Sequence, residues 1–206
     1  SQNLKAILGL ADVFFATQRY EEASQRYLDA LLINDKLVKA HYNLGTIFYY
    51  QKHMDAAKEH LIKSLQLYPK LLGAYLILAQ IYQLSSQTRE SIKLLSKAIE
   101  LAPRNPILYQ KLALLFLHMG QFDSAIKVLH QAISLSPVDV ESNVLLAFAQ
   151  HAMNNDGEAF LAMDTALRAC NQSHNPVDAC RVLLQSYSYF KSQVEKNSTP
   201  ETDGTE

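Results

Sequence analysis

The chain has 206 residues, of which 49% are hydrophobic, and only 6 are Gly and 6 are Pro, with a formal net charge of -1. This composition supports a substantial buried core, argues against an all-β or disordered chain, and gives no net attraction to nucleic acid or anionic membranes. The longest apolar run, residues 71–79, is far shorter than the ~20 residues needed to span a bilayer. A soluble protein without membrane insertion is therefore expected, with the cytoplasm slightly favoured and the compartment otherwise unknown.

The first predicted helix begins at once, with apolar residues at Leu4, Ile7, Leu8 and Leu10. Terminal repeats of stacked helical proteins normally carry a polar outer face. Two interpretations stay open: the chain is cut from a longer protein, or it begins naturally with a modest exposed apolar area.

A pattern then recurs every 34 residues, as the spacing of Pro69, Pro103 and Pro137 shows. In the same register a leucine recurs, a small residue follows it, and another small residue stands further on: Leu44, Leu78, Leu112 and Leu146; Gly45, Ala79, Ala113 and Ala147; Ala57, Ser91, Ala125 and Ala159. Apolar residues at offsets 0, 3, 4 and 7 form one stripe of a helix. Each unit therefore reads as two amphipathic helices joined by a tight turn, where Gly120 tolerates a positive φ.

The pattern weakens towards the C-terminus. Asn143 replaces an expected aromatic residue, and Asn154 to Gly157 shift the turn. Pro176 can open a final helix with an apolar stripe that contains Cys180. We predict a capping helix at 176–195 and a disordered tail at 196–206, because the tail lacks apolar residues.

These columns resemble the tetratricopeptide repeat family, whose repeats have the same leucine, small-residue, aromatic and proline positions. The resemblance implies an all-α fold, a right-handed superhelical solenoid of about five helix-turn-helix repeats with a C-terminal capping helix. The predicted domain covers residues 1–195, with repeats at 4–37, 38–71, 72–105, 106–139 and 140–173.

Sequence motifs with a known catalytic mechanism are absent from the chain, so we expect no enzyme, no cofactor and no metal. His118 and His151, one repeat apart, are either two solvated imidazoles or a pair that converges on a metal or senses pH. Cys170 and Cys180 flank the predicted last loop. The spacing allows a disulfide, and two free, partly buried thiols are favoured.

The resemblance places function on the concave face, which the first helices of successive repeats line. The residues predicted for this partner-binding groove are rich in tyrosine, leucine and glutamine and poor in charge: Leu8, Asp12, Phe15, Lys39, Tyr42, Asn43, Thr46, Tyr49, Tyr50, Leu76, Gln80, Gln83, Gln110, Leu114, Leu117, His118, Phe148 and His151. Aromatic anchors with scattered amides suit an extended or helical peptide. The alternative for each residue is packing against a neighbouring repeat.

One binding mode of the family can be tested against the sequence. Co-chaperone members hold acidic tails of heat-shock chaperones through a Lys and Asn clamp, and at those positions this chain has Leu8, Asp12, Asn43, Gly73 and Ile77. Only Asn43 matches, which argues against that mode.

The sequence therefore predicts a protein-interaction adaptor or scaffold whose weakly charged groove binds a peptide segment or helix of an unidentified protein partner. Two alternatives remain: a recruiting domain of a larger enzyme, and a structural homo-oligomer that associates through the N-terminal repeat.

Overall fold

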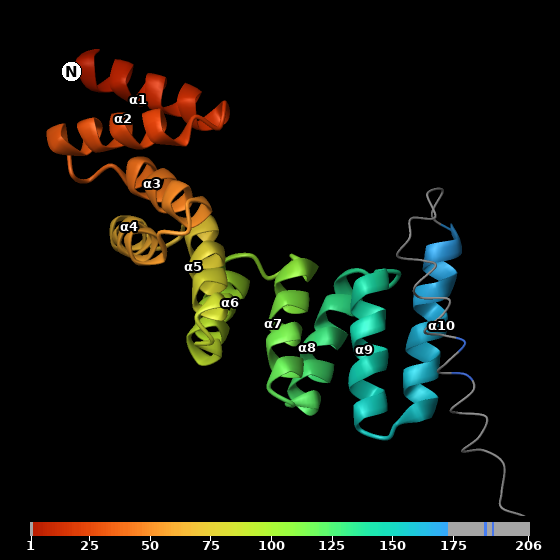
Figure 1. The fold of residues 1–206 in the computed structure, drawn as a ribbon. Helices are drawn as coiled ribbons and strands as arrows, with labels where there is room; N and C mark the ends of the chain where they lie inside the picture. The colour runs from red at the N-terminus through yellow and green to blue at the C-terminus, as the bar shows by residue number, and fades with distance from the viewer. Residues whose placement is uncertain (1, 173–187, 189–190, 192–206) are drawn as a thin grey trace, which may run out of the picture. The chain divides into compact units, whose positions relative to one another are not determined.

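The computed structural model describes residues 2–172, 188 and 191 (Figure 1). Over 2–172 the chain is all-helical, as predicted, and forms α1 (Gln2–Ala16), α2 (Tyr20–Ile33), α3 (Val38–Tyr50), α4 (Met54–Leu67), α5 (Leu72–Leu84), α6 (Thr88–Leu101), α7 (Pro106–His118), α8 (Phe122–Leu135), α9 (Val140–Ala152) and α10 (Asp156–Gln172). The predicted capping helix, apart from residues 188 and 191, and the predicted tail lie outside the described residues.

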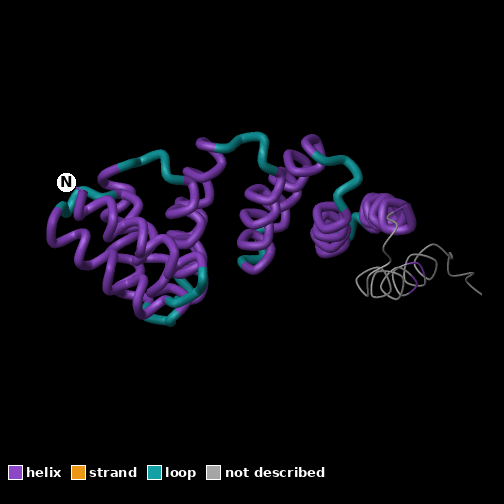
Figure 2. The backbone as a smooth tube through the Cα atoms, turned by 90° about the horizontal axis from the view of Figure 1, so that it is seen from above, coloured by secondary structure: helices purple, strands orange, loops and turns teal. Residues whose placement is uncertain are grey.

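The helices form consecutive hairpins joined by short loops (Figure 2). The chain divides into two compact units, Ser1–Ala102 and Pro103–Glu206. Unit 1 contains α1 to α6, and unit 2 contains α7 to α10.

The turn inside every hairpin has the same backbone conformation. Its second residue has a φ between 58° and 68° in all five hairpins: Gln18, Lys52, Ser86, Gly120 and Asn154. The next residue donates its backbone N–H five residues back, at 2.8–2.9 Å, as Arg19 does to the Phe14 carbonyl. This is the Schellman closure of a helix C-terminus, which requires a left-handed residue. The positive φ predicted at Gly120 is confirmed, and it also occurs at four residues that are not glycine.

A second repeated contact ties each later hairpin to the loop before it. A side chain in the first turn of the first helix binds the carbonyl six residues earlier: His41 to Asp35 at 3.0 Å, Tyr75 to Pro69 at 3.1 Å, Tyr109 to Pro103 at 2.9 Å and Asn143 to Pro137 at 3.1 Å. Asn143, which seemed to break the aromatic column, therefore keeps its hydrogen bond.

Small residues let the two helices of a hairpin approach closely. A Cβ added to Gly45 would lie 2.6 Å from Leu61 Cγ and 3.2 Å from the Ala57 carbonyl oxygen. Ala57 and Leu61 are fully buried, as are Ala125 and Leu129 at the matching positions of unit 2. The repeat columns therefore build the same core in both units.

Cys170, in α10, is 3% exposed and disulfide-bonded. This corrects the expectation of a free thiol. The other cysteine of the sequence, Cys180, lies outside the described residues.

Candidate partner-binding surface

A chain of polar contacts joins the first three helices of unit 1. Tyr27 of α2 is fully buried; its hydroxyl donates to Asp12 Oδ1 of α1 at 2.7 Å and accepts from Asn43 Nδ2 of α3 at 2.6 Å. Lys39 Nζ, at the start of α3, binds Asp12 Oδ2 at 2.6 Å. Burial, reinforced by the hydrogen bond to Asp12, raises the pKa of Tyr27 well above its ordinary value, so the phenol stays protonated and remains a donor.

This network changes what two predicted groove residues offer to a partner. Asn43 is only 6% exposed, and its amide N–H is used by Tyr27. Thr46 is also 6% exposed and donates its hydroxyl to the Tyr42 carbonyl at 2.9 Å. Both residues are buried; Asn43 ties α3 to α2, whereas the Thr46 hydrogen bond stays within α3.

The same three helices also carry a row of aromatic rings, which we call the tyrosine row: Phe15, Tyr20, Tyr50 and Tyr49. The centroids of Tyr20 and Tyr50 are 5.6 Å apart with the planes 28° from parallel; those of Phe15 and Tyr20 are 6.1 Å apart, and those of Tyr49 and Tyr50 are 5.7 Å apart. Lys52 Nζ lies 5.9 Å from the Tyr49 ring centroid. Tyr50, which contacts both Tyr20 and Tyr49, is 54% exposed, so the row presents a ring to solvent.

The groove predicted from the sequence omits Tyr20, a member of the tyrosine row, and the buried Tyr27. Both belong to α2, whereas all predicted groove residues stand on first helices. Tyr20 follows directly after the turn, so the Schellman closure carries its ring back towards the end of α3. The available signal was an aromatic residue at the opening of a second helix.

The remaining predicted positions of unit 1 are partly covered. Leu8 and Phe15 pack on the core formed by α1, α2 and α3. Tyr42 lies over the start of α5, where a Cβ on Gly73 would come 2.5 Å from its hydroxyl oxygen. Farther along α5, Leu76 and Gln80 are half-buried and Gln83 is exposed.

In unit 2 the predicted surface has a different character. Gln110 of α7 is 5% exposed and donates its amide to Asp139 Oδ2 at 2.6 Å and to Ser142 Oγ at 3.0 Å. The same Asp139 oxygen accepts the Ser142 backbone N–H at 2.7 Å and caps α9. Gln110 therefore ties α7 to α9, and its donors are used within the protein.

The other predicted residues of unit 2 are half-buried leucines or exposed side chains. Leu114 and Leu117 are half-buried, His118 is exposed, and Phe148 is 56% exposed. His151 Nδ1 lies 2.7 Å from Asp156 Oδ1. Within the described part of the chain, no group of three or more His, Cys, Asp or Glu residues could hold a metal ion.

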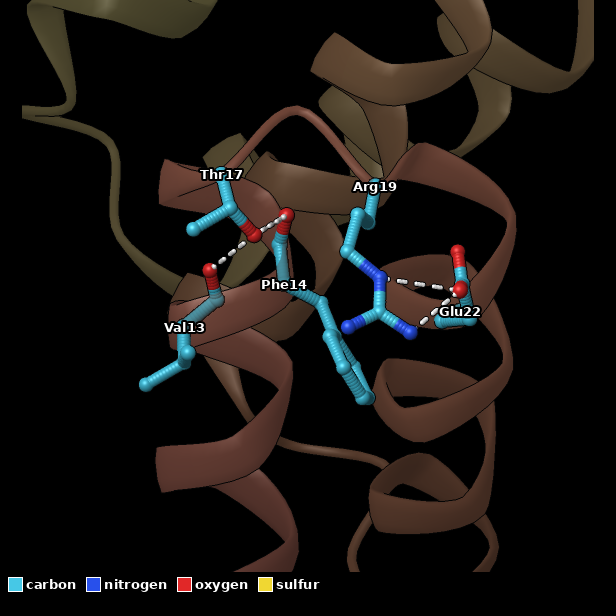
Figure 3. A network of polar contacts seen from close by, with 5 residues as sticks. All are labelled: Val13, Phe14, Thr17, Arg19 and Glu22. Carbon is cyan, nitrogen blue, oxygen red and sulfur yellow. Dashed lines mark hydrogen bonds and ion pairs between the residues drawn. The ribbon is translucent and has the colours of Figure 1, made fainter.

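A different face of the first hairpin exposes apolar side chains. Leu10 and Val13 of α1 are 45% and 57% exposed, whereas Leu44 and Ile47 at the matching positions of α3 are fully buried against the first hairpin. On the same hairpin, Arg19 covers the ring of Phe14, with Cζ 4.4 Å from the ring centroid (Figure 3).

Hydrogen bonds hold Arg19 in this position. Its Nε and Nη2 donate to Glu22 Oε1 at 2.9 and 2.6 Å, and these bonds hold the pKa of Glu22 below its ordinary value. A pocket of about 360 Å³ lies beside them, lined by Leu10, Phe14, Glu21, Glu22, Gln25 and Arg26.

None of the helices in the described residues is long and apolar enough to cross a membrane.

Comparison with known proteins relates this architecture to a family. Models described as "TPR repeat" or "Tetratricopeptide repeat" match residues 11–52, 38–71, 72–105, 94–127 and 111–174. A search of curated proteins gives no significant match.

Several solved structures share the fold. A crystal structure of MamA protein has a TM-score of 0.75 at 22% identity and covers 82% of this chain and 92% of its own. A MamA from Desulfovibrio magneticus RS-1 has a TM-score of 0.75 at 15% identity, with 85% and 99% coverage. YrrB, described as a TPR protein with an unusual peptide-binding site, has a TM-score of 0.70 at 16% identity, with 85% and 90% coverage. The repeat columns, the helical hairpins and these matches agree, and the chain belongs to the tetratricopeptide repeat family.

Proposed function

We propose that the protein is a non-catalytic interaction scaffold that holds a peptide segment or helix of a partner protein on the first-helix face of its repeats. The observation that best supports this is the tyrosine row, which includes the 54% exposed ring of Tyr50. Tyrosine combines a large apolar face with a hydroxyl, and it is enriched among residues that dominate binding energy.

The polar chain of the same three helices favours binding without a large ordering cost. Asp12, Tyr27 and Asn43 connect α1, α2 and α3 before any partner arrives. A surface fixed in advance loses less conformational entropy on binding. The peptide-binding site described for YrrB is consistent with a peptide ligand here by analogy of fold.

The test is replacement of Tyr49 and Tyr50. Partners captured from a lysate and identified by mass spectrometry would be titrated by calorimetry against wild type and against Tyr49→Ala/Tyr50→Ala. We expect a loss of ~2 kcal/mol or more in binding free energy, as for aromatic hot spots.

A matched control tests whether the loss of binding is specific to the tyrosine row or follows from removing any exposed tyrosine. Tyr68 is 48% exposed and stands at the C-terminal end of α4, outside the row, so Tyr68→Ala should bind normally. Because Tyr49 packs partly on the core of unit 1, the single variant Tyr50→Ala and a circular dichroism spectrum check that the fold is intact. Unchanged affinity in a folded double variant contradicts the proposal.

A second candidate function is self-association through the exposed face of α1. It is favoured because Val13 is exposed on α1, whereas Ile47 at the matching position of α3 is buried against the neighbouring hairpin. Light scattering over a concentration series would show growth in mass for wild type and not for Val13→Glu. A strict monomer at high concentration removes this candidate.

A further inference from the structure

Two histidines of the second hairpin face each other across the α3–α4 contact. The Nδ1 atoms of His41 and His60 lie 3.0 Å apart, and the ring centroids are 5.2 Å apart. His41 is 8% exposed, His60 is half-buried, and the Phe48 ring packs beside His60 at 5.5 Å. The pair is therefore part of the packing between the helices.

The partners of the rings determine which nitrogens carry protons. His41 Nε2 lies 3.0 Å from the Asp35 carbonyl oxygen, which can only accept, so His41 carries its proton on Nε2. Its Nδ1 is then an acceptor, and His60 must donate from Nδ1. The neutral pair has one arrangement that satisfies both contacts.

Protonation conflicts with this arrangement. A proton on His41 Nδ1 removes the acceptor that His60 requires. A proton on His60 Nε2 leaves the hydrogen bond intact but puts a charge in a half-buried site, and charging both rings puts two like charges at a nitrogen separation of 3.0 Å. Burial and like charge both favour the neutral form of an imidazole.

The electrostatics of His60 agree with this geometry. Burial, and then the neighbouring His41, lower the pKa of His60, and Glu59 opposes the shift. A histidine with a lowered pKa in the folded state takes up its proton more readily when unfolded. Its contribution to stability is therefore complete above the ordinary histidine pKa of ~6.5 and is lost as the pH falls below it.

The matching positions of the other hairpins contain no such pair. The residues at the position of His41 are Ile7, Tyr75, Tyr109 and Asn143; those at the position of His60 are Arg26, Leu94, Val128 and Ala162. Tyr75 and Tyr109 make the same carbonyl contact as His41 without a group that titrates near neutrality. The repeat therefore does not need two histidines for its architecture.

We propose that the His41–His60 pair is an acid-sensitive joint, in which protonation either removes the His41 Nδ1 acceptor or puts a charge into the half-buried contact, and thereby loosens α3 from α4. Because α3 carries Tyr49 and Tyr50, acidification would also weaken partner binding; that last step rests on the function proposed above. The loosening itself requires no partner and is measured without one.

The experiment is urea unfolding at pH 7.5 and pH 5.0, followed by tyrosine fluorescence, with amide hydrogen exchange corrected for pH to locate the opening. Wild type is compared with His41→Tyr/His60→Leu, which copies the pair of α5 and α6, and with His60→Asn, which keeps a donor but does not titrate. The control is His130→Asn, since His130 is an exposed histidine of α8.

We expect wild type and His130→Asn to lose stability on acidification, with exchange rising in α3 and α4. On the same acidification, the unfolding equilibrium constant of the double variant and of His60→Asn should rise by a factor about threefold or more smaller than in wild type. If wild type and His60→Asn lose the same stability on acidification, the proposal is overturned. This comparison holds even if the double variant fails to fold. If the stabilities change as expected but partner binding does not depend on pH, only the proposed groove function is contradicted.

Discussion

The two units show how one repeat pattern carries two different surfaces. In unit 1 the first-helix face combines stacked aromatic rings with the Lys39 to Asp12 ion pair at 2.6 Å. In unit 2 the face presents half-buried leucines and Phe148, and its main polar contact is the buried amide of Gln110. The cores beneath are alike: Leu61 and Leu129, at matching positions, are both fully buried.

The difference separates two kinds of position in a repeat. Residues of the columns are constrained by contact with the neighbouring helix, so they recur with little freedom in both units. Residues between the columns meet solvent or another first helix, and these vary. Binding specificity is therefore expected in the second group, and stability in the first.

The largest expected effect tests whether the columns are equivalent. Leu61→Ala in unit 1 and Leu129→Ala in unit 2 should each cost ~2–5 kcal/mol in the free energy of unfolding, because each leaves a cavity in a fully buried site. Urea denaturation measures both. A large cost in one unit only would show that the columns are not equivalent.

The close contact between Gly45 and Leu61 can be tested by combining substitutions at both positions. Gly45→Ala should destabilise the wild type by ~1–3 kcal/mol, because the new Cβ would lie 2.6 Å from Leu61 Cγ. In a Leu61→Ala background that clash is gone and only the Ala57 carbonyl oxygen remains close, at 3.2 Å, so Gly45→Ala should cost much less than in wild type. A double-mutant cycle measures the coupling, and additive effects would contradict the packing argument.

The next effect concerns the polar chain of Asp12, Tyr27 and Asn43 in unit 1. Tyr27→Phe should cost ~1–3 kcal/mol, because it leaves the buried Asn43 amide without its acceptor. Tyr75→Phe removes an exposed hydroxyl contact to the Pro69 carbonyl and is the matched control, with a smaller expected cost. Equal midpoints in urea for the two variants would show that the buried network adds no stability.

The smallest effect compares the turns of the two units. Gly120→Ala should destabilise by ~1 kcal/mol from backbone strain alone, because no atom lies within 4 Å of the added Cβ. Ser86→Gly, at the same turn position with φ 58°, should stabilise by about 0.5–1 kcal/mol. Thermal unfolding reports both shifts, and shifts of the same sign would indicate that the left-handed conformation does not govern them.

Much of the fold could be predicted from the sequence because helical periodicity and the 34-residue repeat are local signals. The stripes of α3 to α8 and the small residue at Gly45 follow from spacing alone, since a helix shows one face every 3.6 residues. The left-handed turn residues were missed at Gln18, Lys52 and Ser86 because their side chains do not favour that conformation, whereas Gly120 does. Asparagine also tolerates it, and Asn154 adopts it one period after Gly120, so the expected shift of the turn at Asn154 to Gly157 is wrong.

The candidate surface was predicted less well, because spacing assigns a residue to a face but not to a partner. Asn43 and Gln110 both stand at first-helix positions that suit a groove, yet each is buried and donates to another helix. The sequence left open whether His118 and His151 are two solvated imidazoles or a pair. The structure instead brings together His41 and His60, whose separation in sequence has no repeat periodicity.

By itself, then, the amino-acid sequence determined the family, the helical hairpins and the column residues that stack them, since these depend on periodic contacts within and between adjacent helices. Only the tertiary structure decided which polar side chains are used internally and which rings reach solvent. Tyr20 meets Tyr50, and Asp12 meets Tyr27 and Lys39, because turns of fixed geometry bring distant residues together. Such contacts depend on the packing of three helices at once, and no single helix encodes them.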